Sequence, residues 1–264
     1  MSANPLTNGG RAALSAERLN VRVGTRTLVR DLSLEIAPGE FLAILGRNGS
    51  GKTLTLHTVA GLRPPSGGTV RMGGTPLSQM GRRAIARQSG FLAQDLEDSF
   101  VTSALESVLI GRHPHLSLWE WESEEDEEAA RAALAAVDLA TLGERMTDTL
   151  SGGERRRLAI ASLLAQDPAI FLLDEPTNHL DPHHQLAVLS LFRELANAGR
   201  AVVATLHDPT LAARFADRAL LLSGDGSWSS GPVAQELTAA KLSQLYVTAV
   251  LEIQHRGRRV FVPE

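Results

Sequence analysis

The sequence predicts an α/β fold with a mostly parallel central sheet, and two patterns carry that prediction. Short continuous apolar runs, typical of buried strands, occur at residues 41–45, 170–173, 201–205 and 219–222. Helical patterning occurs between them, at residues 52–60 and 184–198. An alternation of strands and helices along the chain is typical of α/β proteins.

The composition is that of an ordinary globular protein. A chain of 264 residues suits one large domain, or one domain carrying an inserted subdomain. The formal net charge of −4 gives no general attraction to nucleic acid, so we expect no nucleic-acid partner. The absence of cysteine excludes disulfides and Cys-ligated zinc and suits a reducing compartment, with the cytoplasm as the default.

Sequence patterns divide the chain into a leader, a main domain with a helical insertion, and a C-terminal segment. Residues 1–13 are predicted to be a flexible leader and lack the pattern of a signal peptide. No apolar run approaches the roughly 20 residues that span a bilayer. We therefore expect a chain that neither spans the membrane nor is exported. The main domain is expected at 14–231, with a helical insertion at about 96–166, and residues 232–264 are expected to form a small C-terminal appendage.

The first chemical motif follows the predicted strand 41–45 and starts the predicted helix 52–60. It matches the pattern GxxxxGK[ST] and consists of Gly46, Arg47, Asn48, Gly49, Ser50, Gly51, Lys52 and Thr53. Glycines let successive backbone N–H groups point at phosphate oxygens, and the helix N-terminus adds its positive dipole end. Lys52 is predicted to contact the β and γ phosphates and Thr53 to bind Mg²⁺. The alternative is a tight strand-to-helix turn with a chance lysine.

Two acids end the predicted strand 170–173. Ligands sit at the carboxyl ends of strands in open α/β sheets, so these acids are expected at a site. Asp174 is predicted to bind Mg²⁺ and Glu175 to polarise the water that attacks the γ-phosphate. For this segment alone, acids that merely end a strand would be the simpler interpretation.

A second anion site is predicted at Ser151, Gly152, Gly153 and Glu154, where a hydroxyl and glycine N–H groups meet a helix start. Alone, this segment would be an N-cap with glycines. Together the three segments resemble the nucleotide-binding domain of ATP-binding-cassette (ABC) proteins, with residues 150–154 in the place of the signature sequence. The resemblance covers about 19–231. It implies a P-loop NTPase (RecA-like) core with an antiparallel β subdomain and an inserted α-helical subdomain.

The resemblance assigns further residues. Gln94 matches the Q-loop glutamine, which senses Mg²⁺ and the transmembrane partner. The segment from Asn178 to Asp181 resembles the D-loop, and the resemblance implies a nucleotide contact at Asp181. His207 resembles the switch histidine that contacts the γ-phosphate. Taken alone, it would more simply be a surface or core histidine whose hydrogen bonds are satisfied and which has no catalytic role. The implied cofactors are ATP and Mg²⁺.

The family also implies partners. Two nucleotide-binding domains close head to tail, so that Ser151, Gly152 and Gly153 of one chain face the ATP held by Lys52 of the other. One chain carries one copy of each motif, which makes a second copy of the same chain the economical partner. Two transmembrane permease subunits, and indirectly a substrate-binding protein, are the other implied partners. The expected location is peripheral, on the cytoplasmic face of the cell membrane.

The sequence departs from the family at three positions. Val23 stands where an aromatic residue usually stacks on adenine, which predicts a weaker or apolar adenine contact. Arg156 stands where many members have Gln, and Ala93 stands where Pro commonly precedes the Q-loop glutamine. Neither of the last two changes removes a catalytic group.

Residues 109–115 resemble a GRxPH segment of importers for iron chelates (siderophores), haem and vitamin B12. The segment predicts an importer ATPase, with a loop beside the membrane-subunit interface rather than a metal site at His113 and His115. The alternatives are a soluble ABC ATPase, for example in iron–sulfur cluster assembly, and an exporter subunit. The acidic run 120–128 is interpreted as a solvated helix start, while Trp119 and Trp121 fit either a partner contact or a packing edge.

Overall fold

The computed structural model describes residues 12–94, 101–117 and 121–264, and its centre is a six-stranded sheet. The strand order is β10 (Trp228–Pro232), β9 (Arg218–Leu222), β3 (Phe41–Gly46), β8 (Ala201–Thr205), β7 (Ile170–Asp174) and β6 (Ser89–Leu92). All neighbouring pairs from β9 to β6 are parallel, and only β10 pairs antiparallel with β9. The α/β fold with a mostly parallel sheet is confirmed, although β6 and β10 were not among the expected strands.

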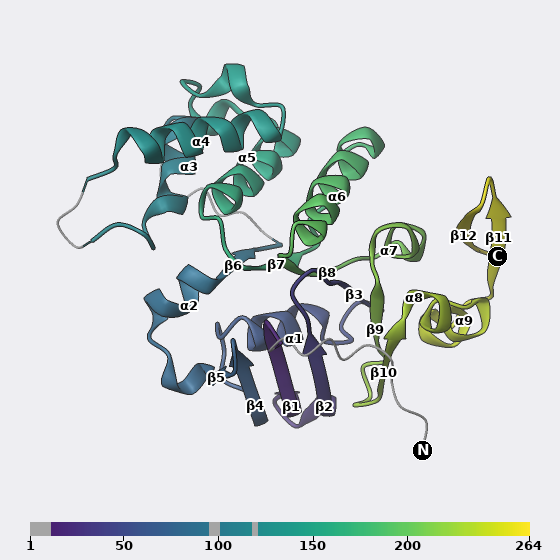
Figure 1. Cartoon of the computed structure of the whole chain (residues 1–264). Helices are drawn as coiled ribbons and strands as arrows, with labels where there is room; N and C mark the ends of the chain where they lie inside the picture. The colour runs from purple at the N-terminus through teal and green to yellow at the C-terminus, as the bar shows by residue number, and fades with distance from the viewer. Residues whose placement is uncertain (1–11, 95–100, 118–120) are drawn as a thin grey trace.

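A second sheet covers one face of the first and contains only antiparallel pairs. Its order is β2 (Arg26–Ile36), β1 (Leu14–Val23), β4 (Gly67–Met72) and β5 (Thr75–Pro76). Buried and exposed residues largely alternate along β2, as expected for strands with one solvated face. Helix α1 (Lys52–Val59) lies between the two sheets, and Leu56 at its centre is fully buried (Figure 1). This is the antiparallel β subdomain that the family resemblance implies.

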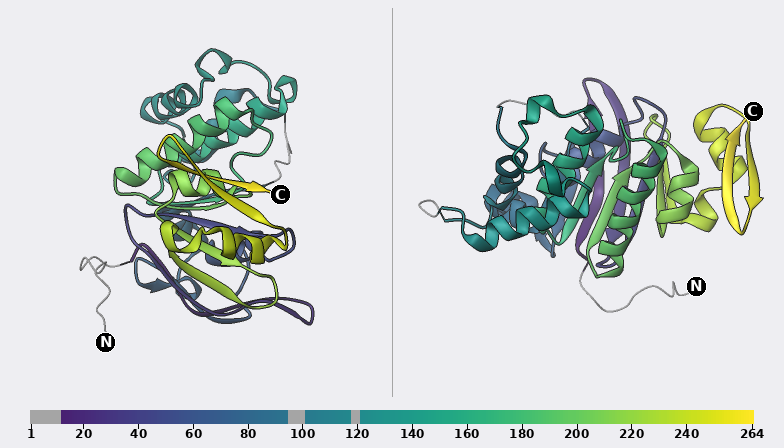
Figure 2. Two further views of the ribbon diagram at one scale, coloured as in Figure 1. Left: turned by 90° about the vertical axis from the view of Figure 1, so that its right-hand side faces the viewer. Right: turned by 90° about the horizontal axis from the view of Figure 1, so that it is seen from above.

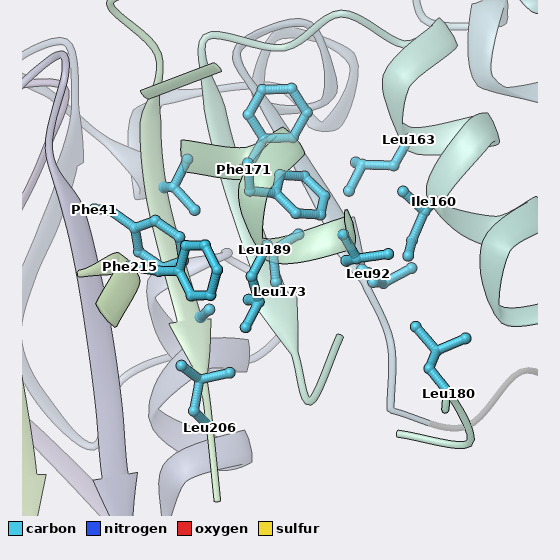
Figure 3. Close-up of a cluster of buried hydrophobic side chains, with 14 of the residues drawn as sticks. Phe41, Leu92, Ile160, Leu163, Phe171, Leu173, Leu180, Leu189, Leu206 and Phe215 are labelled. Carbon is cyan, nitrogen blue, oxygen red and sulfur yellow. The ribbon is translucent and has the colours of Figure 1, made fainter. Parts of the chain in front are cut away.

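The other face of the central sheet packs against helices α5 (Gly152–Ala165), α6 (Pro182–Asn197) and α7 (Pro209–Phe215) (Figure 3). Strand β7 serves both cores. Phe171 and Leu173 point toward the helices, whereas Ile170 and Leu172 belong to the cluster under the antiparallel sheet. A strand buried on both faces explains why the sequence shows a continuous apolar run there instead of an alternation.

A helical region follows β6 and ends with α5 (Figure 1). Its elements are α3 (Ala104–Leu109), η2 (Ile110–Arg112), α4 (Glu124–Ala136), η3 (Ala140–Leu142), η4 (Thr147–Thr149) and α5. The inserted helical subdomain is thus present, while its expected outer limits stay a prediction. Before β6, η1 (Leu77–Gln79) and α2 (Arg82–Gln88) connect the two sheets.

The acidic run forms the start of α4, and its acids at 124, 125, 127 and 128 are exposed as expected. Asp126 is the exception, because only 6% of its surface is exposed. Trp121 is 87% exposed and therefore forms no packing edge. Trp119 and Glu120 lie outside the described residues, as do residues 1–11 of the expected leader.

The C-terminal segment comprises α8 (Val233–Glu236), α9 (Ala239–Tyr246), β11 (Val250–His255) and β12 (Arg258–Pro263). It lies at the opposite end of the molecule from the helical region (Figures 1 and 2). Leu237, Leu242 and Phe261 are buried in the same core as the central helices. The appendage expected at 232–264 therefore shares the main core, and its boundary stays a prediction. No helix in the described ranges has the length and apolar character needed to cross a bilayer.

A buried ion pair holds the helical region together. Asp126 accepts a 2.8 Å hydrogen bond from Arg112 Nε, and Arg112 Nη1 donates to the carbonyl oxygen of Ala165 at the end of α5. Asp126 also closes a capping box with Ser123 at the start of α4. Hydrogen bonds from the Ser123 backbone and from Arg112 lower the pKa of Asp126 to about 2.

A carboxyl group whose pKa is lowered by folding stabilises the fold above its ordinary pKa of about 4, and that contribution is lost as the pH falls toward 2. Asp126→Asn should therefore lower the free energy of unfolding by about 1–2 kcal/mol at pH 7. The difference from the parental chain should shrink between pH 4 and pH 2 in urea titrations. Glu125→Gln, at the exposed neighbouring position, is the matched control. A difference that stays constant over that pH range would contradict this role of the carboxylate.

Candidate nucleotide-binding and hydrolysis site

The predicted phosphate loop joins β3 to α1, and at two of its positions the structure requires or favours glycine. A Cβ atom at Gly46 would lie 2.5 Å from both the carbonyl oxygen of Leu222 and the Ser50 hydroxyl. Gly51, the N-cap of α1, has φ 101°, a backbone conformation that favours glycine. The loop therefore keeps a tight curve that ends at the N-terminus of α1, where backbone N–H groups are available to an anion.

Lys52 begins α1 and is 6% exposed. Its Nζ donates to the carbonyl oxygen of Gly46 at 2.9 Å and to that of Arg47 at 3.4 Å. Burial lowers the pKa of Lys52, and the nearby Glu175 and Asp174 charges oppose that shift. The loop thus holds an ammonium group beside two carboxylates, in the position where phosphate charge would be neutralised.

A cavity of about 270 Å³ opens beside the loop. It is lined by Leu28, Asn48, Gly49, Gly51, Lys52, Thr53, Leu54, Gln94 and Glu175. The predicted loop residues, the predicted Q-loop glutamine and the predicted base thus meet at this cavity, from the loop and the start of α1 and from the segments that follow β6 and β7. Leu28 was not singled out from the sequence.

The end of β7 is organised by a neighbour on β8. Asp174 and Thr205 are paired across the two strands. The Thr205 hydroxyl donates to Asp174 Oδ1 at 2.6 Å and accepts a 2.8 Å hydrogen bond from the backbone N–H of Glu175. Thr205 was not predicted as a site residue, although its place at the end of an apolar run just before His207 was a usable signal.

Asp174 is fully buried, and its Oδ2 has no hydrogen-bond partner among the described residues. A buried carboxylate oxygen without a donor is costly unless it binds a cation or an ordered water. Oxygen ligands are also those that Mg²⁺ prefers. The side chain therefore fits the predicted role in binding Mg²⁺.

Glu175 follows β7 with φ 49°, in the left-handed region. Its Oε1 lies 2.5 Å from His207 Nε2, and the side-chain amide of Asn178 donates to Oε2. The predicted base and the predicted switch histidine are therefore in direct contact, and about half of the His207 side chain remains exposed. Asn178 was placed in the D-loop from the sequence but was not assigned a contact with Glu175.

The predicted signature motif lies away from this cavity. Ser151 is the N-cap of α5: its hydroxyl accepts from the Glu154 N–H at 3.2 Å, and its N–H donates to Glu154 Oε2 at 2.7 Å. Hydrogen bonds from the Ser151 backbone and side chain to the Glu154 carboxylate lower the pKa of Glu154. Ser151 and Gly152 are exposed, and a Cβ at Gly152 would meet open space. Within one chain, this helix start and the phosphate loop form no common site.

Asp181 and Val23, which were also predicted as site residues, are likewise outside the cavity lining. Asp181 caps α6 by accepting from the His184 N–H at 2.9 Å, which lowers its pKa. Val23 is 50% exposed at the end of β1, opposite Arg26 across the hairpin turn. The adenine contact expected at Val23 and the nucleotide contact expected at Asp181 stay predictions.

Comparison with known proteins supports one family. Residues 29–178 match the family described as ABC transporter. The chain is 43% identical to a hemin import ATP-binding protein of Gloeobacter violaceus over 79% of this chain and 78% of that protein. It is 37% identical to the ferric enterobactin transport ATP-binding protein of Escherichia coli, over 89% and 87% of the two chains.

Solved structures agree. One is described as a metal-chelate type ABC transporter in an inward-facing conformation; it is 30% identical and superimposes with a TM-score of 0.83 over 96% of this chain and 98% of that chain. Another is a dimeric ATP-binding cassette in a post-hydrolysis state with bound ADP and phosphate, 26% identical with a TM-score of 0.72 over 83% and 98% of the two chains. Because the matched residues run from the antiparallel sheet through the phosphate loop to Asn178, the chain belongs to the ABC transporter family, as one of its ATP-binding, ATP-hydrolysing subunits.

Proposed function

We propose that the chain is the peripheral ATPase of an importer for a metal chelate, such as a ferric siderophore or haem. In this function it works as a head-to-tail homodimer beneath two permease subunits on the cytoplasmic face of the membrane, and a substrate-binding protein delivers the chelate. One observation carries the proposal: the chain holds both halves of an ATP site, the cavity at Lys52 and the exposed helix start at Ser151, but in separate places. The names of the relatives support the substrate class, while cobalamin rests on the GRxPH-like segment alone.

The residues divide the chemistry between them. The loop N–H groups and Lys52 would bind the β and γ phosphates, while Thr53, Gln94 and Asp174 would hold Mg²⁺. Mg²⁺ supplies positive charge to the phosphate oxygens. Glu175 would accept a proton from the attacking water, and His207 would orient the Glu175 carboxylate.

The dimer completes each site. An exposed Ser151 hydroxyl and the N–H groups at Gly152 and Gly153 form a helix start to which a phosphate can bind. Since this start is not part of its own chain's cavity, a second copy in reverse orientation would bring it over the ATP at Lys52.

Mixed dimers test the head-to-tail arrangement. With Ser151→Arg on one chain and Lys52→Ala on the other, both lesions should fall in the same composite site, so one site stays intact and about half of the parental ATPase activity remains. With both substitutions on one chain, each site carries one lesion, and activity should be nearly lost. Tandem-affinity purification of each mixed dimer followed by phosphate release measures this. Equal activity in the two arrangements would contradict the head-to-tail dimer.

A second cavity, of about 410 Å³ and called the groove from here on, is proposed as the permease contact. It is lined by Ala60, Gly61, Leu62, Arg82, Ile85, Ala86, Ser89, Phe91 and Gln166. Leu62 is 60% exposed at its edge. Because Phe91 lines this groove and Gln94 lines the nucleotide cavity, strand β6 and the residues after it connect the two.

The GRxPH-like segment packs beside this groove. Arg83 and Arg87 of α2 donate to the carbonyl oxygen of Pro114 at 3.1 and 2.7 Å. A ring nitrogen of His115 lies 2.8 Å from the carbonyl oxygen of Gln166, which lines the groove. The segment that predicted the importer subfamily therefore helps to build this surface, which supports a short apolar helix of a permease as the occupant.

Leu62→Glu tests both the partner and the transport role. A charge in the groove should abolish co-purification with the polytopic membrane subunit and uptake of the labelled chelate, while ATP hydrolysis by the isolated chain stays within about twofold because the nucleotide cavity is untouched. Val247→Glu, at another exposed apolar residue that lies outside the groove, is the matched control. Uptake of labelled ferric siderophore, haem and cobalamin in parallel identifies the substrate. Recovery of the parental chain without any membrane subunit would favour a soluble role such as iron–sulfur cluster assembly.

A further inference from the structure

A buried arginine lies beneath the hydrolysis site, at one of the positions where the sequence departs from the family. Arg156 belongs to the second turn of α5, and only 1% of its surface is exposed. It is the largest fully buried side chain in the described part of the molecule. Burying a guanidinium group is unfavourable unless its N–H groups are hydrogen-bonded, so its surroundings indicate what it does.

The guanidinium donates to backbone carbonyl oxygens from two strand ends. On the side of β6, Nη1 donates to Ala93 and, at 3.4 Å, to Gln94. On the side of β7, Nη2 donates to Asp174 at 2.6 Å and to Glu175 at 2.7 Å. A glutamine amide has only two N–H donors, whereas the rigid guanidinium has five, so the arginine can hold both strand ends at once.

These contacts bear on the conformation of Glu175. A non-glycine residue in the left-handed region is conformationally strained and persists where the surrounding contacts fix it in place. Here the Glu175 N–H donates to Thr205, and the Glu175 carbonyl oxygen accepts from Arg156. Both peptide units that flank the strained residue are therefore fixed, and the Glu175 carboxylate points toward His207 and the nucleotide cavity.

The same guanidinium fixes the Q-loop backbone. Gln94 and Glu175 line the cavity from neighbouring strand ends, and Arg156 bonds the carbonyl oxygens of both residues. We propose that Arg156 is a positioning residue for hydrolysis, which sets the backbone of Glu175 and its placement relative to Gln94. This inference rests on the proposed role of Glu175 as the general base.

Arg156→Gln, which introduces the residue common in the family, should lower kcat about 10- to 100-fold, the scale of loss for a displaced catalytic group. The affinity for ATP should change less than about twofold, because the phosphate loop and Lys52 remain in place. Arg156→Lys keeps the charge without the planar fork and should also lower kcat. Arg157→Gln is the matched control, since Arg157 is on the same helix but donates to Val137 and Asp138 in the helical region.

A double-mutant cycle separates positioning from general structural support. In the full-length Glu175→Gln chain, adding Arg156→Gln should slow single-turnover hydrolysis less than twofold further, because the group that Arg156 positions is already disabled. An equal fold loss in both backgrounds, or a loss of ATP affinity as large as the loss in kcat, would overturn the proposal. If Glu175→Gln alone left turnover at the parental rate, the assignment of the base would fail instead. Should Arg156→Gln not fold, the same cycle with Arg156→Lys decides.

Discussion

The parallel pairing of β3, β8 and β7 is the constraint on which the site depends. Ile44 is paired with Thr205, and Thr205 is paired with Asp174, so the three strands end side by side. The predicted phosphate loop leaves β3, His207 follows β8, Asp174 ends β7 and Glu175 comes directly after it. Both faces of β3, β7 and β8 are buried in packed cores, so a one-residue shift in register would move each side chain into the core on the other face of the sheet. The packing of the two cores therefore fixes the relative positions of these ends.

Several polar and charged side chains are buried at this edge of the central sheet. Lys52, Asp174, Glu175 and Thr205 are all buried, and burial of such groups is unfavourable unless they are paired. The Thr205 hydroxyl donates a hydrogen bond to Asp174, and the carbonyl oxygen of Gly46 accepts one from Lys52, so these groups are partly paired. The remaining oxygen of Asp174 is the part that a cation would satisfy. The edge is therefore arranged for a charged ligand rather than for the stability of the empty protein.

Sequence reasoning was most successful where local patterns determine structure. Continuous apolar runs located β3, β7, β8 and β9, and the spacing of Ser151 and Glu154 is that of a capping box. Strand β6 was not predicted because it has only four residues and begins with Ser89-Gly90. Strand β10 was not predicted because Ser229, Ser230 and Gly231 show no strand pattern. The partners of Arg156 come from segments about 60 and 20 residues away in sequence, so their convergence depends on tertiary packing.

The assignment of Glu175 as the base is tested most directly by comparing ATP binding and ATP hydrolysis in Glu175→Gln. Glutamine keeps the size of the side chain and can still accept a hydrogen bond, but it cannot take a proton from water. ATP affinity should be retained, and turnover should fall by roughly 10²- to 10⁴-fold, the contribution of general base catalysis. A variant that binds ATP and hydrolyses it at the parental rate would contradict this role of Glu175.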